Sequence, residues 1–235
     1  MRPTLFSSRR SPHCFKVSIA LHEKGVRFDR VEIDLRTREQ KTAAYLALNP
    51  RGKVPAYFDE DGAHLDSLDI LLHLEVAHPE PRSFPADERA RRDVLTWIDW
   101  SSGPLRDVSH HLYWQLIEPP EAGIDHVRAE TLLAEGRRHL HAVEEALERS
   151  GGRWIVAAPD LPGPSAADVC VYAWLSGYRR FGLPDTDLPR LGSWLASLDT
   201  RPAVMVSRDT VGVPFAQWRS TAPRASDLES LDDER

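Results

Sequence analysis

The amino-acid sequence predicts an α/β domain followed by an all-α domain. Segments with strand-like alternation or short apolar runs occur in roughly the first third of the chain, where they alternate with helix-like segments. Beyond residue 81 the periodic segments have helical spacing, and only Trp154-Ile155-Val156 suggests a strand. A length of 235 residues is long for one compact domain and sufficient for two small ones.

The N-terminal segments follow the element order of a thioredoxin-like domain. Ser11 is a favourable helix N-cap and Pro12 suits the first helical position. Gly62 marks the turn of a hairpin. The predicted elements are a strand at 4–7, a helix at 11–25, a strand at 31–35, a short helix at 39–48, a hairpin at 54–65 and a helix from 66 to about 77.

Helices account for most of the remaining chain. His78-Pro79-Glu80-Pro81 breaks the pattern and predicts a linker. Ser165 and Asp168 have the spacing of a capping box, in which the Ser oxygen accepts a backbone N–H and the acid reaches back. The predicted helices span 86–117, 124–149, a segment that begins at 165, 188–198 and 202–208, and the polar tail at 221–235 is predicted to be disordered.

Composition excludes several classes of function. The net charge is −6 and no stripe of basic and aromatic residues is present, which argues against nucleic-acid binding. No stretch approaches the roughly 20 apolar residues of a membrane helix, and the N-terminus lacks the apolar region of a secretory signal. Two cysteines, Cys14 and Cys170, cannot form a disulfide scaffold. We therefore expect a cytoplasmic protein with no membrane or nucleic-acid partner.

Two helix starts are candidates for ligand chemistry. The free N–H groups and dipole at the helix that begins with Ser11 favour negative charge, so its hydroxyl could donate to a thiolate, the nucleophilic form of a thiol. At the helix that begins with Asp66-Ser67, the Ser hydroxyl and the amides suit a carboxylate, while the Asp suits an ammonium. Both serines are also consistent with plain helix caps.

A third candidate segment is Asn49-Pro50-Arg51-Gly52-Lys53-Val54-Pro55. The Val54–Pro55 step is a candidate cis peptide bond, although few X–Pro bonds are cis. A cis bond would turn the backbone N–H and C=O of Val54 outward, where an extended peptide could pair with them. The alternative is an ordinary turn before the hairpin.

In combination, these three segments resemble the glutathione transferase superfamily, and the Asn-Pro-x-Gly-Lys-Val-Pro run is the most specific of them. The capping box resembles that family's C-terminal folding motif, and the resemblance covers about residues 4–208. It implies the glutathione transferase fold and a homodimer. The implied division is a thioredoxin-like thiol-binding domain at 1–78, a linker at 79–86, an all-helical electrophile-binding domain at 87–210 and a partly disordered tail at 211–235.

The resemblance also implies residue roles. No Tyr lies near the first strand, so the chain is most similar to serine-type zeta- and theta-like members, with Ser11 as the catalytic hydroxyl and Ser7 or Ser8 as alternatives. The implied glutathione-binding residues are Gln40, Lys41, Lys53, Val54, Pro55, Asp66 and Ser67. The implied electrophile-binding residues are His13, Arg106, His110, Tyr113 and Trp114, for which core packing or plain solvent exposure is the alternative.

The expected function is a glutathione-dependent transferase that directs the thiol at a small electrophile, by conjugation, dehalogenation, ether cleavage or cis–trans isomerisation. The excess of Arg over Lys suggests a GC-rich genome, and some GC-rich bacteria use thiols other than glutathione. Another thiol such as mycothiol is therefore an alternative co-substrate. The alternatives are a thiol–disulfide oxidoreductase that uses Cys14 or two glutathiones, and a binding protein without catalysis. The absence of a Cys at position 11 argues against the first alternative.

The sequence also predicts the environment of the two cysteines, two alternatives for His13 and the absence of a metal site. Cys14 and Cys170 are expected to be buried. His13 is either a substrate contact or an exposed loop residue. No metal site is expected, because His110 and His111 are adjacent and would point to different faces of a helix.

Overall fold

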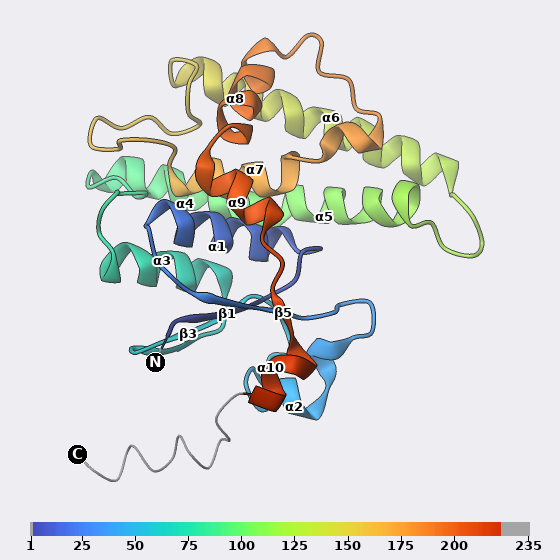
Figure 1. Ribbon diagram of the computed structural model, residues 1–235. Coiled ribbons are helices and arrows are strands. Elements are labelled where there is room, and N and C mark those ends of the chain that lie inside the picture. Colours follow the sequence, from blue (N-terminus) through green and yellow to red (C-terminus); the bar gives the residue numbers. More distant parts are fainter. Residues whose placement is uncertain (1, 222–235) are drawn as a thin grey trace.

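The chain contains a five-stranded mixed sheet with helices on both of its faces, followed by a helical C-terminal region (Figure 1). The computed structural model describes residues 2–221. The strand order is β4-β3-β1-β2-β5, in which β1 pairs parallel with β2 and antiparallel with β3. The strands are β1 (Thr4–Ser7), β2 (Asp29–Glu32), β3 (Ala56–Asp59), β4 (Gly62–His64) and β5 (Val213–Pro214).

Alternation along β1 separates two small cores. Leu5 packs with side chains of α1 (Pro12–Glu23) and α3 (Ser67–Ala77), on the sheet face that is directed toward the C-terminal helices. Phe6 points to the opposite face, where it packs beside the short α2 (Ala43–Leu46). A 3₁₀ turn, Glu39–Lys41, precedes α2. The two helix starts that were singled out by sequence therefore lie on the same face of the sheet.

The C-terminal helices build the largest core. The central helix of this region, α7 (Ala166–Leu175), packs against both α1 and α4 and joins the two parts of the molecule. Within residues 2–221 no helix is both long and apolar enough to cross a membrane. The other helices are α4 (Glu88–Ser102), α5 (Pro104–Leu112), α6 (His126–Arg149), α8 (Pro189–Asp199) and α9 (Pro202–Asp209).

The predicted single helix at 86–117 is wrong. The structure has α4, then a break at Gly103, then α5, and finally a π-helical turn at Tyr113–Ile117. Gly103 leaves the helical region, with φ −111° and ψ −100°, and Pro104 has no N–H to continue the hydrogen-bond ladder. The regular helix is therefore interrupted at these two adjacent residues.

The predicted strand at 154–156 is also wrong. The capping box is present as predicted, but its Asp168 carboxylate also accepts the backbone N–H of Ile155 at 2.7 Å. That N–H is consequently bonded to a side chain rather than to a neighbouring strand. The same carboxylate accepts Trp194 Nε1 at 2.8 Å, so it fixes a loop and α8 as well as the start of α7.

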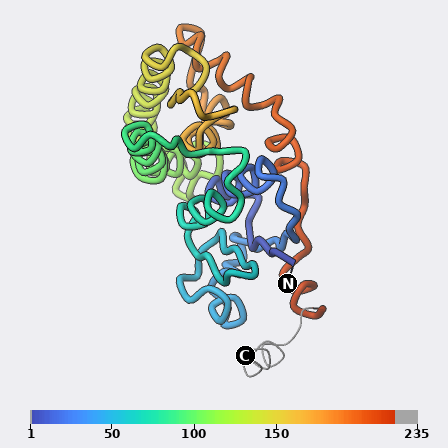
Figure 2. Tube along the Cα trace, turned by 90° about the vertical axis from the view of Figure 1, so that its left-hand side faces the viewer, coloured from blue at the N-terminus to red at the C-terminus, as the bar shows by residue number. Residues whose placement is uncertain are grey.

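The prediction of a partly disordered tail at 211–235 needs correction for its first part. Residues 213–214 add β5 to the edge of the sheet, and α10 (Phe215–Thr221) follows directly. Phe215 and Trp218, one helical turn apart, both pack edge-on against Phe6. Figure 2 shows the chain returning from the helical region to the sheet, close to the N-terminus. Residues 222–235 lie outside the described part of the chain.

Candidate functional site

Ser11 is the most accessible of the three candidate serines. It is the N-cap of α1, with extended backbone angles, and its Oγ accepts the Cys14 N–H at 3.3 Å. Ser7 and Ser8 are buried, and the Ser7 hydroxyl accepts Arg30 Nε at 2.8 Å. The half-buried Ser11 hydroxyl can still donate its own proton, whereas Ser7 is enclosed at the end of β1.

The starts of α1 and α3 meet through His13 and Ser67. The Ser67 Oγ and the His13 Nδ1 are 3.4 Å apart, and Ser67 is only 8% exposed. The His13 ring also packs edge-on against Trp174 of α7, with 5.3 Å between the ring centroids. The alternative that His13 is an exposed loop residue is therefore wrong: it lies in the first turn of α1 and is packed on two sides.

Charged candidate residues surround His13. Burial lowers the pKa of His13 to about 3, and the positive charges of Lys16, Arg106 and Lys53 lower the pKa further, while Asp66 opposes them. The imidazole is therefore neutral at pH 7. Because these groups belong to α1, α5, the loop before β3 and the start of α3, the pKa shift also reflects how closely these segments approach one another.

The loop before β3 is fixed by hydrogen bonds to one of its own carbonyl groups. The Lys53 carbonyl accepts Asn49 Nδ2 at 2.8 Å and the Tyr45 hydroxyl at 2.7 Å, and Asn49 is fully buried. Gly52 has φ +57°, and a Cβ there would lie 3.0 Å from the Gln40 carbonyl oxygen. The conformation of the loop itself therefore requires Asn49 and Gly52, independently of any ligand.

The Val54–Pro55 peptide bond is cis, as predicted. Among residues 2–221 the Val54 N–H has no hydrogen-bond partner. This donor, directly before β3, is thus free to pair with an extended ligand.

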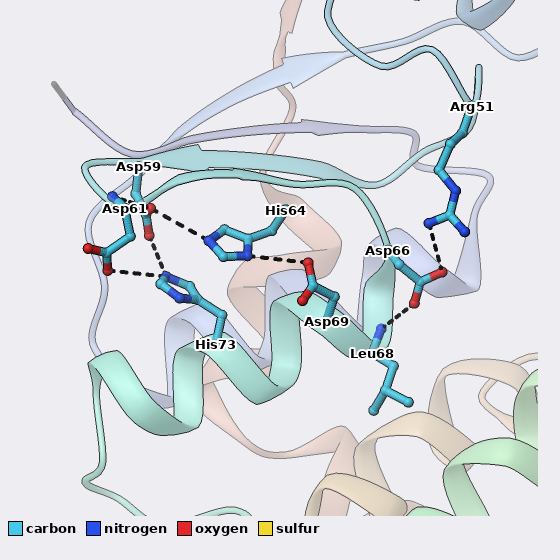
Figure 3. A network of polar contacts seen from close by, with 8 residues as sticks. All are labelled: Arg51, Asp59, Asp61, His64, Asp66, Leu68, Asp69 and His73. Atoms are coloured by element: carbon cyan, nitrogen blue, oxygen red, sulfur yellow. Dashed lines mark hydrogen bonds and ion pairs between the residues drawn. The ribbon is translucent and has the colours of Figure 1, made fainter. Parts of the chain in front are cut away.

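Asp66 ties this loop to the start of α3. Its Oδ1 accepts the Leu68 N–H at 2.9 Å, as an N-cap, and its Oδ2 lies 3.9 Å from Arg51 Nη1 (Figure 3). The Asp66 side chain is 55% exposed, so its carboxylate can still contact a ligand. The structure therefore brings Ser67, Asp66 and the 49–55 loop to one side of α3.

The remaining predicted glutathione-binding residues are Lys53, within that loop, and Gln40 and Lys41, which approach Gly52 of the loop. The side-chain Oε1 of Gln40 is buried and has no hydrogen-bond partner within the described chain. Lys41 and Lys53 are exposed, and the Lys41 Nζ approaches Gly52. These groups offer one amide and two ammonium groups to a negatively charged ligand end.

Apart from His13 on α1, the predicted electrophile-binding residues are spread along α5 and the π-helical turn. Arg106 pairs with the neighbouring Asp107 and acts electrostatically on His13. His110 Nε2 accepts a hydrogen bond from Trp114 Nε1 at 3.0 Å. These two side chains therefore lie on the same side of the helix, as their spacing of four residues predicts. Trp114 is 48% exposed, although a tryptophan in a purely structural role is usually buried.

Sequence reasoning missed an ion-pair network at the same end of α5. Arg10, directly before Ser11, donates to Glu118 Oε1 at 2.6 Å and to the Tyr113 hydroxyl at 2.6 Å. Arg36 donates to the same Glu118 oxygen at 2.7 Å. These hydrogen bonds lower the pKa of Glu118 to about 2. No local pattern predicts contacts across more than 80 residues, yet this network joins the loop of Ser11 to the predicted electrophile side.

Cys14 is unsuited to thiol–disulfide exchange in this arrangement. It is 1% exposed, and burial raises the pKa of its thiol to about 11, despite the hydrogen bond to Ser11. The thiol form, which is a poor nucleophile, therefore dominates at neutral pH. Cys170 is fully buried in the helical core, and both cysteines are buried as expected.

Sequence comparison finds relatives of the N-terminal region and of the whole chain. Residues 5–82 match the family model "Glutathione S-transferase, N-terminal domain". A glutathione S-transferase zeta class protein of Euphorbia esula is 42% identical over 83 residues, which are 35% of this chain and 37% of that protein. A probable maleylacetoacetate isomerase of Caenorhabditis elegans is 28% identical over 209 residues, 88% of this chain and 92% of that protein.

Structure comparison extends the likeness over both regions. A theta class glutathione S-transferase from Xanthomonas axonopodis pv. citri, solved with glutathione bound, superposes with a TM-score of 0.77 at 25% identity. The match covers 89% of this chain and 98% of that one. The five-stranded sheet and the helical C-terminal region thus have the glutathione transferase fold.

Proposed function

Because the chain belongs to the glutathione transferase superfamily, we propose that it is an enzyme that activates the thiol of glutathione for attack on a small electrophile. The observation that supports this proposal most is the convergence of three helix or strand starts on one side of the sheet. Ser11 and His13 contribute from α1, the cis-proline loop from β3, and Asp66 and Ser67 from α3.

Glutathione would lie extended along this edge. The free Val54 N–H would pair with the backbone of its cysteinyl residue, next to Pro55. The Ser67 hydroxyl and the first amides of α3 would hold the γ-glutamyl carboxylate, and Asp66 its ammonium. The amide of Gln40 and the ammonium groups of Lys41 and Lys53 would meet the glycine carboxylate.

In this pose the sulfur would lie at the N-terminus of α1. The Ser11 hydroxyl donates a hydrogen bond to the thiolate, and the dipole of the helix favours the negative charge. The electrophile would occupy the side of α5, beside Arg106, His110, Tyr113 and Trp114.

Among the four reactions, the likeness to a probable maleylacetoacetate isomerase favours thiol-assisted cis–trans isomerisation. The thiolate adds to a conjugated double bond, which becomes a single bond. After rotation about that bond the sulfur leaves again, so glutathione is regenerated. Arg10, which directly precedes Ser11, and Arg106, whose charge acts on His13, would suit an electrophile that bears carboxylates.

The proposal is tested by Ser11 variants across pH. With Ser11→Ala, the pKa of bound glutathione rises, turnover at neutral pH falls by about 10- to 1000-fold, and much of the activity returns at higher pH. Panels of electrophiles and of thiols, including mycothiol, are assayed with the parent protein. An Ser11→Ala variant as active as the parent at every pH would show that Ser11 is not beside the sulfur.

Ser11→Cys provides a matched second variant. It places a thiol at a helix N-terminus, where thiol pKa values are lowered. Conjugation or isomerisation should decrease, and glutathione-dependent disulfide reductase activity should appear. Strong reductase activity in the parent itself would instead support the oxidoreductase alternative. Glutathione binding without turnover of any electrophile would support the binding-protein alternative.

The homodimer predicted from the family is also part of this proposal. Analytical ultracentrifugation at micromolar concentration should give a sedimentation coefficient for twice the chain mass of 26.6 kDa. A monomer at all concentrations that are used for the activity assays would remove the dimer from the proposal.

A further inference from the structure

A second polar cluster lies between the β3–β4 hairpin and α3 (Figure 3). Asp59 ends β3, His64 ends β4, and His73 projects from α3 toward both (Figure 3). One side-chain nitrogen or oxygen of each residue lies within 4.8 Å of the others. Two imidazoles and a carboxylate are ligands that Zn²⁺ and related ions commonly use.

Strand register explains why these residues meet. Tyr57 pairs directly with His64 across the hairpin, and Asp59 follows two residues later on the same face of β3. α3 covers this face and brings His73 to 2.7 Å from Asp59 Oδ2. The two imidazole rings stack with 3.8 Å between their centroids. The cluster therefore rests on two strands and a helix rather than on a loop.

Two buried polar atoms in the cluster lack partners in the described chain. His64 Nε2 has no hydrogen bond, although it is buried and points toward Asp59 Oδ1 at 3.9 Å. The Tyr57 hydroxyl is likewise without a partner, and Tyr57 is fully buried. Unpartnered buried polar atoms are unusual and call for a ligand or water.

The contact between His64 and Asp69 is of the kind that orients a metal-binding histidine. Asp69 Oδ2 lies 3.3 Å from His64 Nδ1, so a proton on Nδ1 would be shared with this carboxylate and the lone pair would be left on Nε2. This carboxylate–histidine arrangement commonly orients metal ligands in proteins. It makes the unpartnered Nε2 an available ligand atom.

Local charge also favours a cation. Asp59, Asp61 and Asp69 surround the two imidazoles, and within residues 2–221 none of the three forms an ion pair with Lys or Arg. A divalent ion bound at Asp59, His64 and His73 would therefore lie among carboxylates that pair with no Lys or Arg in the described chain.

We propose that Asp59, His64 and His73 bind a divalent transition-metal ion, with Zn²⁺ as the best match to the ligand set. The ion joins the β3–β4 hairpin to α3 and leaves its fourth position to water. Because an imidazole lone pair lies in the ring plane, the two stacked rings rotate apart on binding. To bind through Nε2, His73 takes the tautomer that carries its proton on Nδ1: the Nε2 proton shared with Asp59 goes to water and Nδ1 takes one up, so the ring stays neutral. This site is separate from the proposed glutathione site and does not depend on it.

The direct test uses the full-length protein, freed of metal with a chelator. Titration calorimetry with ZnCl₂ should show one saturable site per chain, and Co²⁺ should give the intense visible absorption of a tetrahedral site. Zn²⁺ should also raise the thermal denaturation midpoint, because it binds the folded state. Absence of both the heat and the Co²⁺ spectrum overturns the proposal.

Variants locate the ion. His64→Asn and His73→Asn should each weaken Zn²⁺ binding by more than about 100-fold, while Asp69→Asn weakens it by roughly 10-fold, as expected for an outer contact. His141→Asn, an exposed histidine on α6, is the matched control and leaves binding unchanged. Zn²⁺ binding that survives in both His64→Asn and His73→Asn overturns the assignment.

A crystal of the parent protein soaked in Zn²⁺ provides a measurement that does not depend on how the variants fold. Anomalous scattering should place the ion between Asp59, His64 and His73. Density only at other residues, such as His110 and His111, contradicts the proposal.

Discussion

His13 shows how a single residue links folding to the candidate site. Its pKa is lowered to about 3 by burial and by neighbouring positive charges. Below pH 6.5 the unfolded chain therefore binds a proton that the folded chain does not bind. The stability that depends on a neutral His13 is complete above about pH 6.5 and is lost progressively as the pH falls toward 3.

Replacement of His13 by Gln should flatten this pH dependence. Between pH 6.5 and pH 5 the parent should lose up to about 1.4 kcal/mol per pH unit more than His13→Gln, as measured by urea unfolding. His141→Gln, which alters an exposed ring on α6, should follow the parent. Parallel curves for the parent and His13→Gln would show that His13 is not buried in its neutral form.

Ser67 and Ser11 should differ in which kinetic constant they affect. The Ser67 hydroxyl would contact the γ-glutamyl end of glutathione, far from the sulfur, so Ser67→Ala removes an interaction that ground and transition states share. KM for glutathione should rise by about 10-fold with kcat nearly unchanged, whereas Ser11→Ala should lower kcat. A large fall in kcat for Ser67→Ala, at unchanged affinity for glutathione, would contradict its assignment.

At the scale of one residue, the sequence was informative where local chemistry determines structure. Helix caps at Ser11, Asp66 and Ser165 could be predicted, because Ser and Asp satisfy free N–H groups within three residues. The network of Arg10, Glu118 and Arg36 could not be predicted, because its members meet only after both regions have folded.

Among the elements, α7 depends most on a single side chain. Asp168 is fully buried and accepts hydrogen bonds from Ile155 N, Ser165 N, Ser165 Oγ and Trp194 Nε1. Burial raises the pKa of this carboxyl group, while the hydrogen bonds oppose the shift. The side chain therefore holds α7, the preceding loop and α8 together.

Asp168→Ala should destabilise the protein by about 3 kcal/mol or more, since several buried donors lose their acceptor. Asp125→Ala, which removes the cap of α6 where Asp125 Oδ1 accepts Arg128 N, is the control and should cost about 0.5–2 kcal/mol. Urea denaturation with an unchanged slope measures both. Equal midpoints for parent and Asp168→Ala would refute the role of the buried carboxylate.

The C-terminal elements β5 and α10 were not predicted, and the reason is physical. A two-residue strand and a seven-residue helix have too little periodicity of their own to be recognised. They form because Val213 pairs with Val31 and because Phe215 packs against Phe6 and Tyr45. Their existence depends on a surface that the first strand and α2 create.

Phe215→Ala should therefore destabilise the sheet region as a core substitution does, by about 3–5 kcal/mol. The Phe215 side chain is 3% exposed, whereas Val211, in the segment just before β5, is 64% exposed. Val211→Ala is the matched control and should change stability by less than about 0.5 kcal/mol. A thermal midpoint that is equal in Phe215→Ala and the parent would show that this segment does not stabilise the fold.

At the scale of the whole molecule, the family likeness and the residue-level reasoning converge. The sheet and the helical region could be predicted from alternating and helical periodicity, and the predicted binding residues come from three segments that the fold brings together. The His64–His73 cluster was missed, since its residues are unremarkable in sequence and meet only through strand register and helix packing. The division at 79–86 remains our proposal for the domain boundary.

The central claim, that glutathione binds extended between α1, the cis-proline loop and α3, is tested most directly by calorimetric titration of glutathione into the parent protein and into Ser67→Ala. We predict one saturable site per chain in the parent and an affinity about 10-fold lower in Ser67→Ala. S-methylglutathione should still bind to the parent, because its backbone and terminal charges are intact. No saturable binding of glutathione at millimolar concentration, or equal affinity in the two proteins, would contradict the account.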